Sequence, residues 1–403
     1  PKGILTGVST GVEEFILREM ADKKLPSLSI AIVNGSNKWS AGYGYTDLEG
    51  TRRATSETVY RVGSVSKLFT DIGIMQLEES GLLDPDAPVT TYLPDFQPEN
   101  PFGKEITLRQ LMSHRAGLVR EPPVGHYFDP TEPDLASTVA SLNNTRLVHE
   151  PESKIKYSNA GIAVVGRVLE KLQGKPFADY LKTAVLDPLG MYGSSFKPEQ
   201  AHREKLSAAL MWGYDGRTFP APGFELGMAP AGSMYSTVED LATFMQAMMG
   251  GETEVIGSET LEEMWTPQFA TPEAKTGFGL GFSISELDGK KVVGHGGAIY
   301  GFATELAMIP SEGIGVVVTC SRDMANQTAG RIARYALEAV LAAKNGEAAK
   351  VPEATGPVDP AMAKALDGYY EADSGKIELR ERDGRLQIWF GSIRSEIRSL
   401  GDR

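Results

Sequence analysis

The chain of 403 residues has a single cysteine, Cys320, which excludes an intrachain disulfide. Cys320 ends the apolar run 314–320, so we interpret it as a small buried strand residue without a catalytic role. Only five histidines are present, and they are scattered without the H-E-x-x-H pattern or the clustered spacing of metal ligands. The sequence therefore predicts no metal and no other cofactor.

Long apolar runs and an excess of positive charge are also lacking. No apolar run approaches the roughly 18 residues that cross a bilayer, so the sequence predicts no membrane span. Asp and Glu outnumber Lys and Arg by 53 to 40, and the net charge of −13 argues against nucleic acid and anionic membrane surfaces as partners. With 41% hydrophobic residues, the chain can bury a sizeable core, and its length allows more than one domain.

Ser64 and Lys67 stand three residues apart near the start of an amphipathic stretch, residues 63–70. The preceding run 58–62 predicts a strand, and Gly63 allows a sharp turn, so that Ser64 begins a helix. Side chains three apart lie on the same helix face, which brings the lysine amine to the serine hydroxyl. Such a base is what a serine needs before it can act as a nucleophile.

The same spacing occurs a second time, at Ser153 and Lys156. That copy follows Pro151 and lacks a helical apolar stripe, so we interpret it as a loop. The helix after Ser64 does have such a stripe, formed by Leu68, Ile72 and Met75. Because the S-x-x-K pattern is common by chance, neither copy alone predicts a function.

Two further motifs lie far along the chain. One is Tyr157-Ser158-Asn159, and the other is His295 followed by two glycines. His295 ends the run 291–295, which predicts a strand of a sheet together with later strands. A single tyrosine or histidine is more often a packing residue than a catalytic one, so their weight comes from the combination with S-x-x-K.

With these motifs, the chain resembles the serine β-lactamase and penicillin-binding protein superfamily, specifically its class C-like branch of esterases and D-aminopeptidases. The resemblance runs from about residue 8 to about residue 345. It rests on several blocks in the same order as in the family: residues 60–67, 81–84, 92–94, 108–118, 157–159 and 230–241.

The resemblance implies a role for each motif residue. Ser64 would be the nucleophile, and Lys67 and Tyr157 would exchange its proton. Tyr157 would also protonate the leaving group or activate the deacylating water. Asn159 would orient the lysine and the acyl amide of the substrate.

The third motif departs from the β-lactamase pattern. β-Lactamases carry Lys-Thr-Gly there, whereas this chain has His295, as D-aminopeptidase-like members do. A histidine can be neutral at pH 7, so a fixed carboxylate-binding cation is missing. Gly296 and Gly297 would leave room for a substrate backbone, and the N–H groups of Ala298 and Ser64 would form the oxyanion hole.

A literal Lys275-Thr276-Gly277 also occurs. It precedes the run 278–282, which in the family forms the strand before the catalytic one. We therefore place it one strand too early and reject it as the third motif; if this is wrong, penicillin hydrolysis is favoured.

For the fold, the resemblance implies an α+β architecture of the β-lactamase/transpeptidase type. It is an α/β sandwich, an antiparallel sheet flanked by helices, with an inserted all-α lobe and the active site between the lobes. The expected strands and the expected final helix are residues 27–33, 39–43, 302–309, 315–319 and 327–341.

We expect a hydrolase domain at residues 1–345, a linker at 346–360 and a short C-terminal β segment at 361–403. Strand alternation around a turn at 383–384 resembles the beginning of a lipocalin-like barrel. Such a barrel needs about eight strands. Only three or four fit here, so the segment is either a truncated barrel or a small flap.

Together these features predict a serine hydrolase that cleaves small ester or peptide-like amide bonds through an acyl-enzyme at Ser64, as carboxylesterases and D-aminopeptidases do. The alternative enzyme is a β-lactamase or D,D-peptidase, distinguished by turnover of a β-lactam. The alternative of another class is a non-catalytic scaffold or assembly protein on the same fold. Loops 120–132 and 212–224, rich in Pro, Gly and aromatic residues, are expected to wall the pocket. Because many relatives are exported, the resemblance favours a periplasmic or secreted location.

Overall fold

A seven-stranded antiparallel sheet forms the centre of the computed structural model, which describes residues 2–212, 217–250, 253–372, 375–390 and 393–400. The strand order is β2-β1-β11-β10-β9-β8-β7. The strands are β1 (Ser27–Asn34), β2 (Asn37–Gly44), β7 (Gly277–Phe278), β8 (Ser283–Leu287), β9 (Lys290–Ile299), β10 (Phe302–Ile309) and β11 (Ile314–Cys320). The predicted α+β fold is thereby confirmed.

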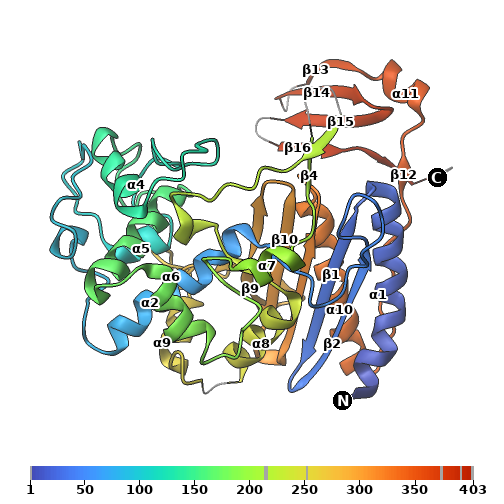
Figure 1. Cartoon of the computed structure of the whole chain (residues 1–403). Helices are drawn as coiled ribbons and strands as arrows, with labels where there is room; N and C mark the ends of the chain where they lie inside the picture. The colour runs from blue at the N-terminus through green and yellow to red at the C-terminus, as the bar shows by residue number, and fades with distance from the viewer. Residues whose placement is uncertain (1, 213–216, 251–252, 373–374, 391–392, 401–403) are drawn as a thin grey trace.

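Helices cover both faces of this sheet (Figure 1). On one face lie α1 (Lys2–Lys23) and α10 (Asn326–Lys344), which share one hydrophobic core with β1 and β11. On the other face, α8 (Val238–Met249) packs on β1 and β11 as part of the larger core. Because both faces are covered, the seven residues of β11, which read IGVVVTC, are all buried.

The helical lobe is inserted between β2 and β7 (Figure 1). Its central helix is α2 (Ser66–Glu79), which contacts α5 (Asn159–Gln173) and α6 (Phe177–Leu181). Apart from α8, the other α-helices described in this stretch are α3 (Leu108–Met112), α4 (Leu135–Ser141), α7 (Gln200–Lys205) and α9 (Ser258–Met264). Two short two-stranded antiparallel sheets also lie here: β3 (Tyr60–Arg61) with β6 (Tyr235–Ser236), and β4 (Leu210–Trp212) with β5 (Thr218–Pro220).

Some elements differ from the sequence-based expectation. The strand predicted at 58–62 is only the two-residue β3, and the whole of β8 was not predicted. Helix α1 was also missed, although Val8, Val12 and Phe15 recur at helical spacing and are buried. The ring of Phe15 meets that of Tyr335 on α10 edge-on at 5.2 Å, so α1 belongs to the packed core.

The C-terminal segment forms a four-stranded antiparallel sheet with the short helix α11 (Pro360–Ala365). Its strands are β13 (Gly368–Ala372), β14 (Gly375–Arg382), β15 (Arg385–Phe390) and β16 (Ile393–Glu396). A further pair joins β12 (Gly356–Pro357) to β17 (Arg398–Ser399). Within the described ranges these strands do not close into a barrel, so a truncated barrel and a small flap both stay open, and the domain limits at 345 and 361 stay predictions.

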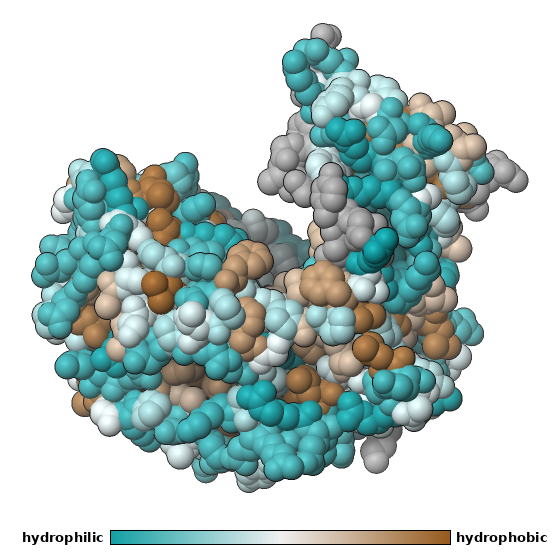
Figure 2. Space-filling view, turned by 45° about the horizontal axis from the view of Figure 1, so that its top comes forward, coloured by the Kyte–Doolittle hydropathy of each residue, from teal (hydrophilic) through white to brown (hydrophobic). Residues whose placement is uncertain are grey.

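This C-terminal sheet projects from the body, and its visible surface is mainly hydrophilic (Figure 2). Its turn at Asp383 and Gly384 has positive φ at both residues, 51° and 73°, as the predicted hairpin requires. Ion pairs attach the C-terminal segment to the end of α1, where Arg398 on β17 lies 2.8 Å from Asp22. Among the helices that the structure describes, none is long and apolar enough to cross a bilayer.

Candidate active site

Ser64 lies in a 3₁₀ turn, Gly63–Val65, that leads directly into α2. Gly63 has a φ of +53°, and a Cβ there would lie 2.7 Å from the backbone nitrogen of Ala298 on β9. A Cβ at Gly297 would lie 2.0 Å from the carbonyl oxygen of Val62. The two glycines therefore let the nucleophile turn and β9 approach backbone to backbone.

This packing corrects the roles expected for the glycines. The space that Gly297 leaves is filled by the backbone of the nucleophile turn rather than by a substrate. A Cβ at Gly296 would meet Glu305 Oε2 at 3.0 Å, and the neighbours of Glu305 on β10, Ala303 and Ala307, belong to the core under α10. Gly296 thus faces the sheet surface opposite the helical lobe.

Helix α2 is buried on nearly all sides rather than along one stripe. Leu68, Ile72 and Met75 are fully buried as predicted, but so are Lys67 and Asp71 on the same helix. The helix therefore holds a lysine amine in the protein interior, where a charged ammonium is costly.

The Lys67 amine contacts two oxygens. Its Nζ lies 3.0 Å from Ser64 Oγ and donates to the carbonyl oxygen of Ala231 at 2.6 Å. Burial lowers the pKa of Lys67 to about 7, although the carboxyl groups of Asp71 and Glu121 act in the opposite direction. Near pH 7 a large share of the amine is neutral and can accept the serine proton.

Tyr157 reaches the same serine from the start of α5. Ser158 caps this helix, since its Oγ accepts the Gly161 N–H at 2.9 Å, and Tyr157 lies one residue before the cap. The Tyr157 hydroxyl donates to Ser64 Oγ at 2.9 Å. Burial raises the pKa of Tyr157 to about 12, so the phenol keeps its proton. Ser64 Oγ therefore lies between an amine base and a phenol acid.

Asn159 takes a different place from the one expected. Its Nδ2 donates to Glu121 Oε1 at 2.8 Å, and the described hydrogen bonds of Lys67 go to Ser64 and Ala231 instead. The Oδ1 atom of Asn159 is buried and has no partner among the described residues. The Asn159 side chain therefore lies in the site but does not hydrogen-bond to Lys67.

His295 lies on β9, with its ring centroid 6.1 Å from that of Tyr157. Its Nδ1 contacts the Gly296 carbonyl oxygen. Burial, followed by the nearby Lys67, lowers the pKa of His295 to about 4. The ring is thus neutral at pH 7, in agreement with the missing cation inferred from the sequence.

The β9–β10 hairpin orients the backbone of Ala298. Its two-residue turn, Tyr300 and Gly301, has positive φ at both positions. Away from such a turn, opposite residues of the two strands alternate between hydrogen-bonded and non-hydrogen-bonded pairs. Ile299 and Phe302 form the hydrogen-bonded pair next to the turn. Ala298 and Ala303 are therefore a non-hydrogen-bonded pair, and their backbone groups point away from each other. In keeping with this, the Tyr127 hydroxyl approaches the Ala298 carbonyl oxygen at 3.5 Å. The N–H of Ala298 consequently faces outward from β10, beside the nucleophile turn.

Several residues near Ser64 were not predicted. His114 lies against Tyr157 with ring centroids 4.2 Å apart, Phe278 meets His114 at 5.0 Å, and the Arg120 guanidinium lies 5.1 Å from the Tyr157 ring centroid. His114 stands in block 108–118, which carried the resemblance but no role. Ala231 acts through its backbone carbonyl, and the identity of a residue gives no signal for such a contact.

The literal Lys275-Thr276-Gly277 triplet is not on the strand that carries His295. Lys275 is exposed and pairs with Glu286 at 3.3 Å. Gly277 begins β7, the edge strand, and β8 lies between β7 and β9. In chain order the triplet therefore stands two strands before β9 rather than the one expected, and its rejection as the third motif stays a prediction.

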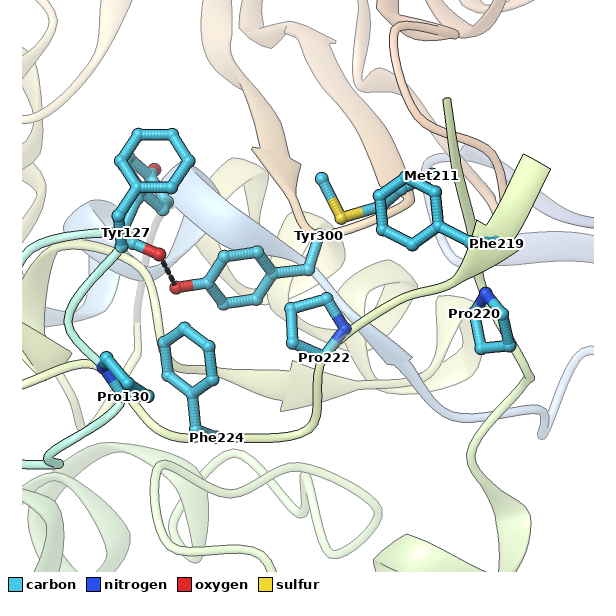
Figure 3. Close-up of a pocket in the computed structure, with 9 residues that line it drawn as sticks. Tyr127, Pro130, Met211, Phe219, Pro220, Pro222, Phe224 and Tyr300 are labelled. Carbon is cyan, nitrogen blue, oxygen red and sulfur yellow. Dashed lines mark hydrogen bonds between the residues drawn. The ribbon is translucent and has the colours of Figure 1, made fainter. Parts of the chain in front are cut away.

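A cavity of about 390 Å³ adjoins the β9–β10 hairpin (Figure 3). Most of the residues that line it belong to the two segments predicted to wall the pocket, 120–132 and 212–224. The residues that line it are Tyr127, Phe128, Pro130, Met211, Phe219, Pro220, Pro222, Phe224 and Tyr300.

Comparison with known proteins agrees with this geometry. A family model described as Beta-lactamase matches residues 12–341. The chain belongs to the β-lactamase family. It is 30% identical over 318 residues to Beta-lactamase-like protein 2 of Dictyostelium discoideum, covering 76% of the chain and 58% of that relative. It is 28% identical over 264 residues to a teichoic acid D-alanine hydrolase of Staphylococcus aureus, covering 65% of the chain and 64% of the relative.

Each of these two relatives is thus longer than the part that the chain matches. Among solved structures, the octameric penicillin-binding protein homologue from Pyrococcus abyssi is similar with a TM-score of 0.76 and 27% identity. That likeness covers 96% of this chain and 89% of the other. Since several relatives are named as hydrolases, membership of the family supports a hydrolase.

Proposed function

We propose that the chain is a serine hydrolase that cleaves small ester or peptide-like amide bonds through an acyl-enzyme at Ser64. The observation that carries the proposal is the double contact of Ser64 Oγ, with Lys67 Nζ at 3.0 Å and Tyr157 Oη at 2.9 Å. A nucleophile with a base on one side and an acid on the other suits acyl transfer.

In acylation, Ser64 Oγ attacks the carbonyl carbon while its proton passes to the Lys67 amine. The carbonyl oxygen becomes an oxyanion, held by the N–H groups of Ser64 and Ala298. When the tetrahedral intermediate collapses, the bond to the leaving group breaks. Tyr157 gives its proton to that group, and protonated Lys67 restores the proton on Tyr157.

In deacylation the same groups act in reverse. A water molecule attacks the acyl carbon and loses a proton to the neutral Lys67 amine. Ser64 leaves as a hydroxyl after taking a proton from Tyr157, and protonated Lys67 then restores the proton on Tyr157. The acid and the neutral enzyme are the products, so each proton removed from the enzyme is returned within one cycle.

The charge at the third motif supports one substrate class over another. His295 is neutral at pH 7 and Lys275 lies two strands away, so the site offers no fixed cation at the third motif. This supports esters and neutral amides over penicillins. The relative named as a D-alanine hydrolase supports including D-aminoacyl substrates in the test.

The test compares the protein with Ser64→Ala on a short-chain p-nitrophenyl ester, a D-aminoacyl p-nitroanilide and a chromogenic cephalosporin. The proposal predicts serine-dependent cleavage of the ester or the anilide without cephalosporin turnover. Fast cephalosporin turnover would instead indicate a β-lactamase. Absence of all three activities would favour a non-catalytic scaffold.

A further inference from the structure

The aromatic cavity is joined to the reacting end of the site through Ala298. Tyr300 follows Ala298 by two residues at the hairpin turn, and its hydroxyl donates to the carbonyl oxygen of Tyr127 (Figure 3). The hydroxyl of Tyr127 in turn approaches the Ala298 carbonyl oxygen at 3.5 Å. Two lining residues therefore connect directly with the strand segment proposed to bind the oxyanion.

The lining is apolar throughout. Aromatic rings, prolines and one methionine surround the space, and among the described residues that line it none carries a charged side chain. In Figure 3 the side chains of Tyr300, Phe224 and Pro222 lie side by side along the wall. A volume of about 390 Å³ falls at the small end of the roughly 300–1,000 Å³ of ligand pockets. Such a space suits one aryl ring or a medium-length alkyl chain.

The position of the acid distinguishes the two ends of the substrate. Tyr157, the proposed proton donor to the leaving group, lies with His114 and His295 at ring distances of 4.2 and 6.1 Å. The cavity is instead lined by Tyr300, further along the hairpin, and by Tyr127, whose hydroxyl approaches the Ala298 carbonyl oxygen. The leaving group belongs on the Tyr157 side, so the cavity faces the acyl part.

Arg61 ties the cavity wall to the nucleophile segment. It is buried on β3, three residues before Ser64, and donates to the Phe224 carbonyl oxygen at 3.1 Å. Its guanidinium lies 5.2 Å from the Tyr300 ring centroid and 5.3 Å from that of Tyr235. Because the wall and Ser64 are held by one short piece of backbone, the cavity has a fixed position relative to the reacting bond.

We propose that this cavity binds the acyl group of the substrate and that the preferred acyl group is apolar, an arylacetyl or a medium-chain alkanoyl group. The proposal rests on the proposed serine hydrolase function, because only then is one part of the substrate an acyl group. It goes beyond that function by naming which part of the substrate the enzyme selects.

The first experiment measures kcat/KM for p-nitrophenyl acetate, octanoate and phenylacetate. Wild type should favour octanoate and phenylacetate over acetate by about tenfold or more, as apolar groups in a matching pocket do. Phe219→Ala, at a half-exposed lining position, should lose about fivefold on the two larger esters and little on acetate. Phe219→Asp, which places a charge at the same position, should lose more.

Phe102→Ala is the matched control, because Phe102 is similarly exposed and does not line the cavity. It should leave the preference unchanged. Equal kcat/KM for acetate and octanoate in wild type would overturn the proposal. So would a loss in the Phe219 variants that is the same for all three esters.

A binding measurement separates this proposal from the proposed function. Calorimetry with the Ser64→Ala protein should show phenylacetamide binding at least about tenfold more tightly than acetamide, and Phe219→Asp in that background should abolish the difference. If hydrolysis fails but this preference is present, the function is wrong and the apolar site stands. If hydrolysis depends on Ser64 but the preference is absent, the function stands and the acyl-group proposal is wrong.

Discussion

The groups proposed to act on the scissile bond and the groups that face the rest of the substrate are built on different kinds of structure. Lys67 is fully buried within α2 and His295 lies on a central strand, whereas Phe128 in a loop and Phe219 on the short strand β5 line the cavity and are 83% and 45% exposed. Regular buried elements fix the distances that proton transfer needs. Exposed loops can change without disturbing them, so the chemistry and the substrate preference can vary separately.

The largest effect should come from the nucleophile. Ser64→Ala should reduce kcat/KM by at least about 10⁴-fold while leaving the melting temperature nearly unchanged, because a small hydroxyl is removed. Ser153→Ala is the control, since Ser153 belongs to the second S-x-x-K copy, which the structure places in a turn. Equal activity in Ser64→Ala and wild type would end the assignment.

The next effect tests whether the base and the acid work as one unit. Lys67→Ala and Tyr157→Phe should each lose most of kcat, and the double variant should lose little more than the worse single variant. Both side chains contact the same Ser64 Oγ, so once either is removed, the other can no longer take part in the proton transfer. A double variant whose loss equals the product of the single losses would mean that the two act independently.

The pH dependence should report the ionisation of Lys67. Only the neutral amine accepts a proton, and burial sets the pKa of Lys67 to about 7. Thus kcat/KM should rise about tenfold per pH unit below pH 7 and level off above it. Tyr157, with a pKa of about 12, keeps its proton throughout this range.

Glu121→Gln should move the midpoint to lower pH, because the carboxylate of Glu121 raises the pKa of Lys67. Activity that is highest near pH 5 and falls as the pH rises would contradict Lys67 as the base.

The smallest effect is expected at Arg61, and it tests whether the cavity influences kcat/KM separately from the reacting groups. Arg61→Lys keeps the charge but loses the planar guanidinium that reaches Phe224 and lies over Tyr300. It should lower kcat/KM for the octanoate ester by about fivefold to tenfold and for the acetate ester by about twofold or less. Arg203→Lys is the control, since Arg203 is an exposed partner of the same Glu225. An equal loss on both esters would show that Arg61 supports Ser64 rather than the cavity.

The difference between regular buried elements and exposed loops also explains how much of the structure could be predicted from the sequence. Continuous apolar runs predicted the strands at 27–33 and 315–319 and the helix at 327–341, because burial on one or both faces leaves a periodic signal. The spacing of Ser64 and Lys67 predicted their contact because the 3₁₀ turn and α2, which follows it directly, keep residues three apart on one face. Helix α1 also carries such a periodicity, but its partner α10 lies more than 300 residues away, and its place in the fold became visible only in the structure.

Contacts made by backbone atoms were beyond reach of the sequence. Lys67 is held by the carbonyl oxygen of Ala231 and not by Asn159, and Gly297 makes room for the carbonyl oxygen of Val62 and not for a substrate. Every residue has such a carbonyl, so residue type does not mark the one that is used. The cavity depends on three separate segments, and its volume follows from their packing rather than from any motif.

The most direct test of the central claim is the detection of the covalent intermediate. Rapid acid quenching during turnover of p-nitrophenyl octanoate, followed by intact-mass and peptide mass spectrometry, should show one octanoyl group attached to Ser64. The adduct should form before steady state and be absent in Ser64→Ala. An octanoyl group on another residue, or steady turnover with no adduct and with activity retained in Ser64→Ala, would contradict the account.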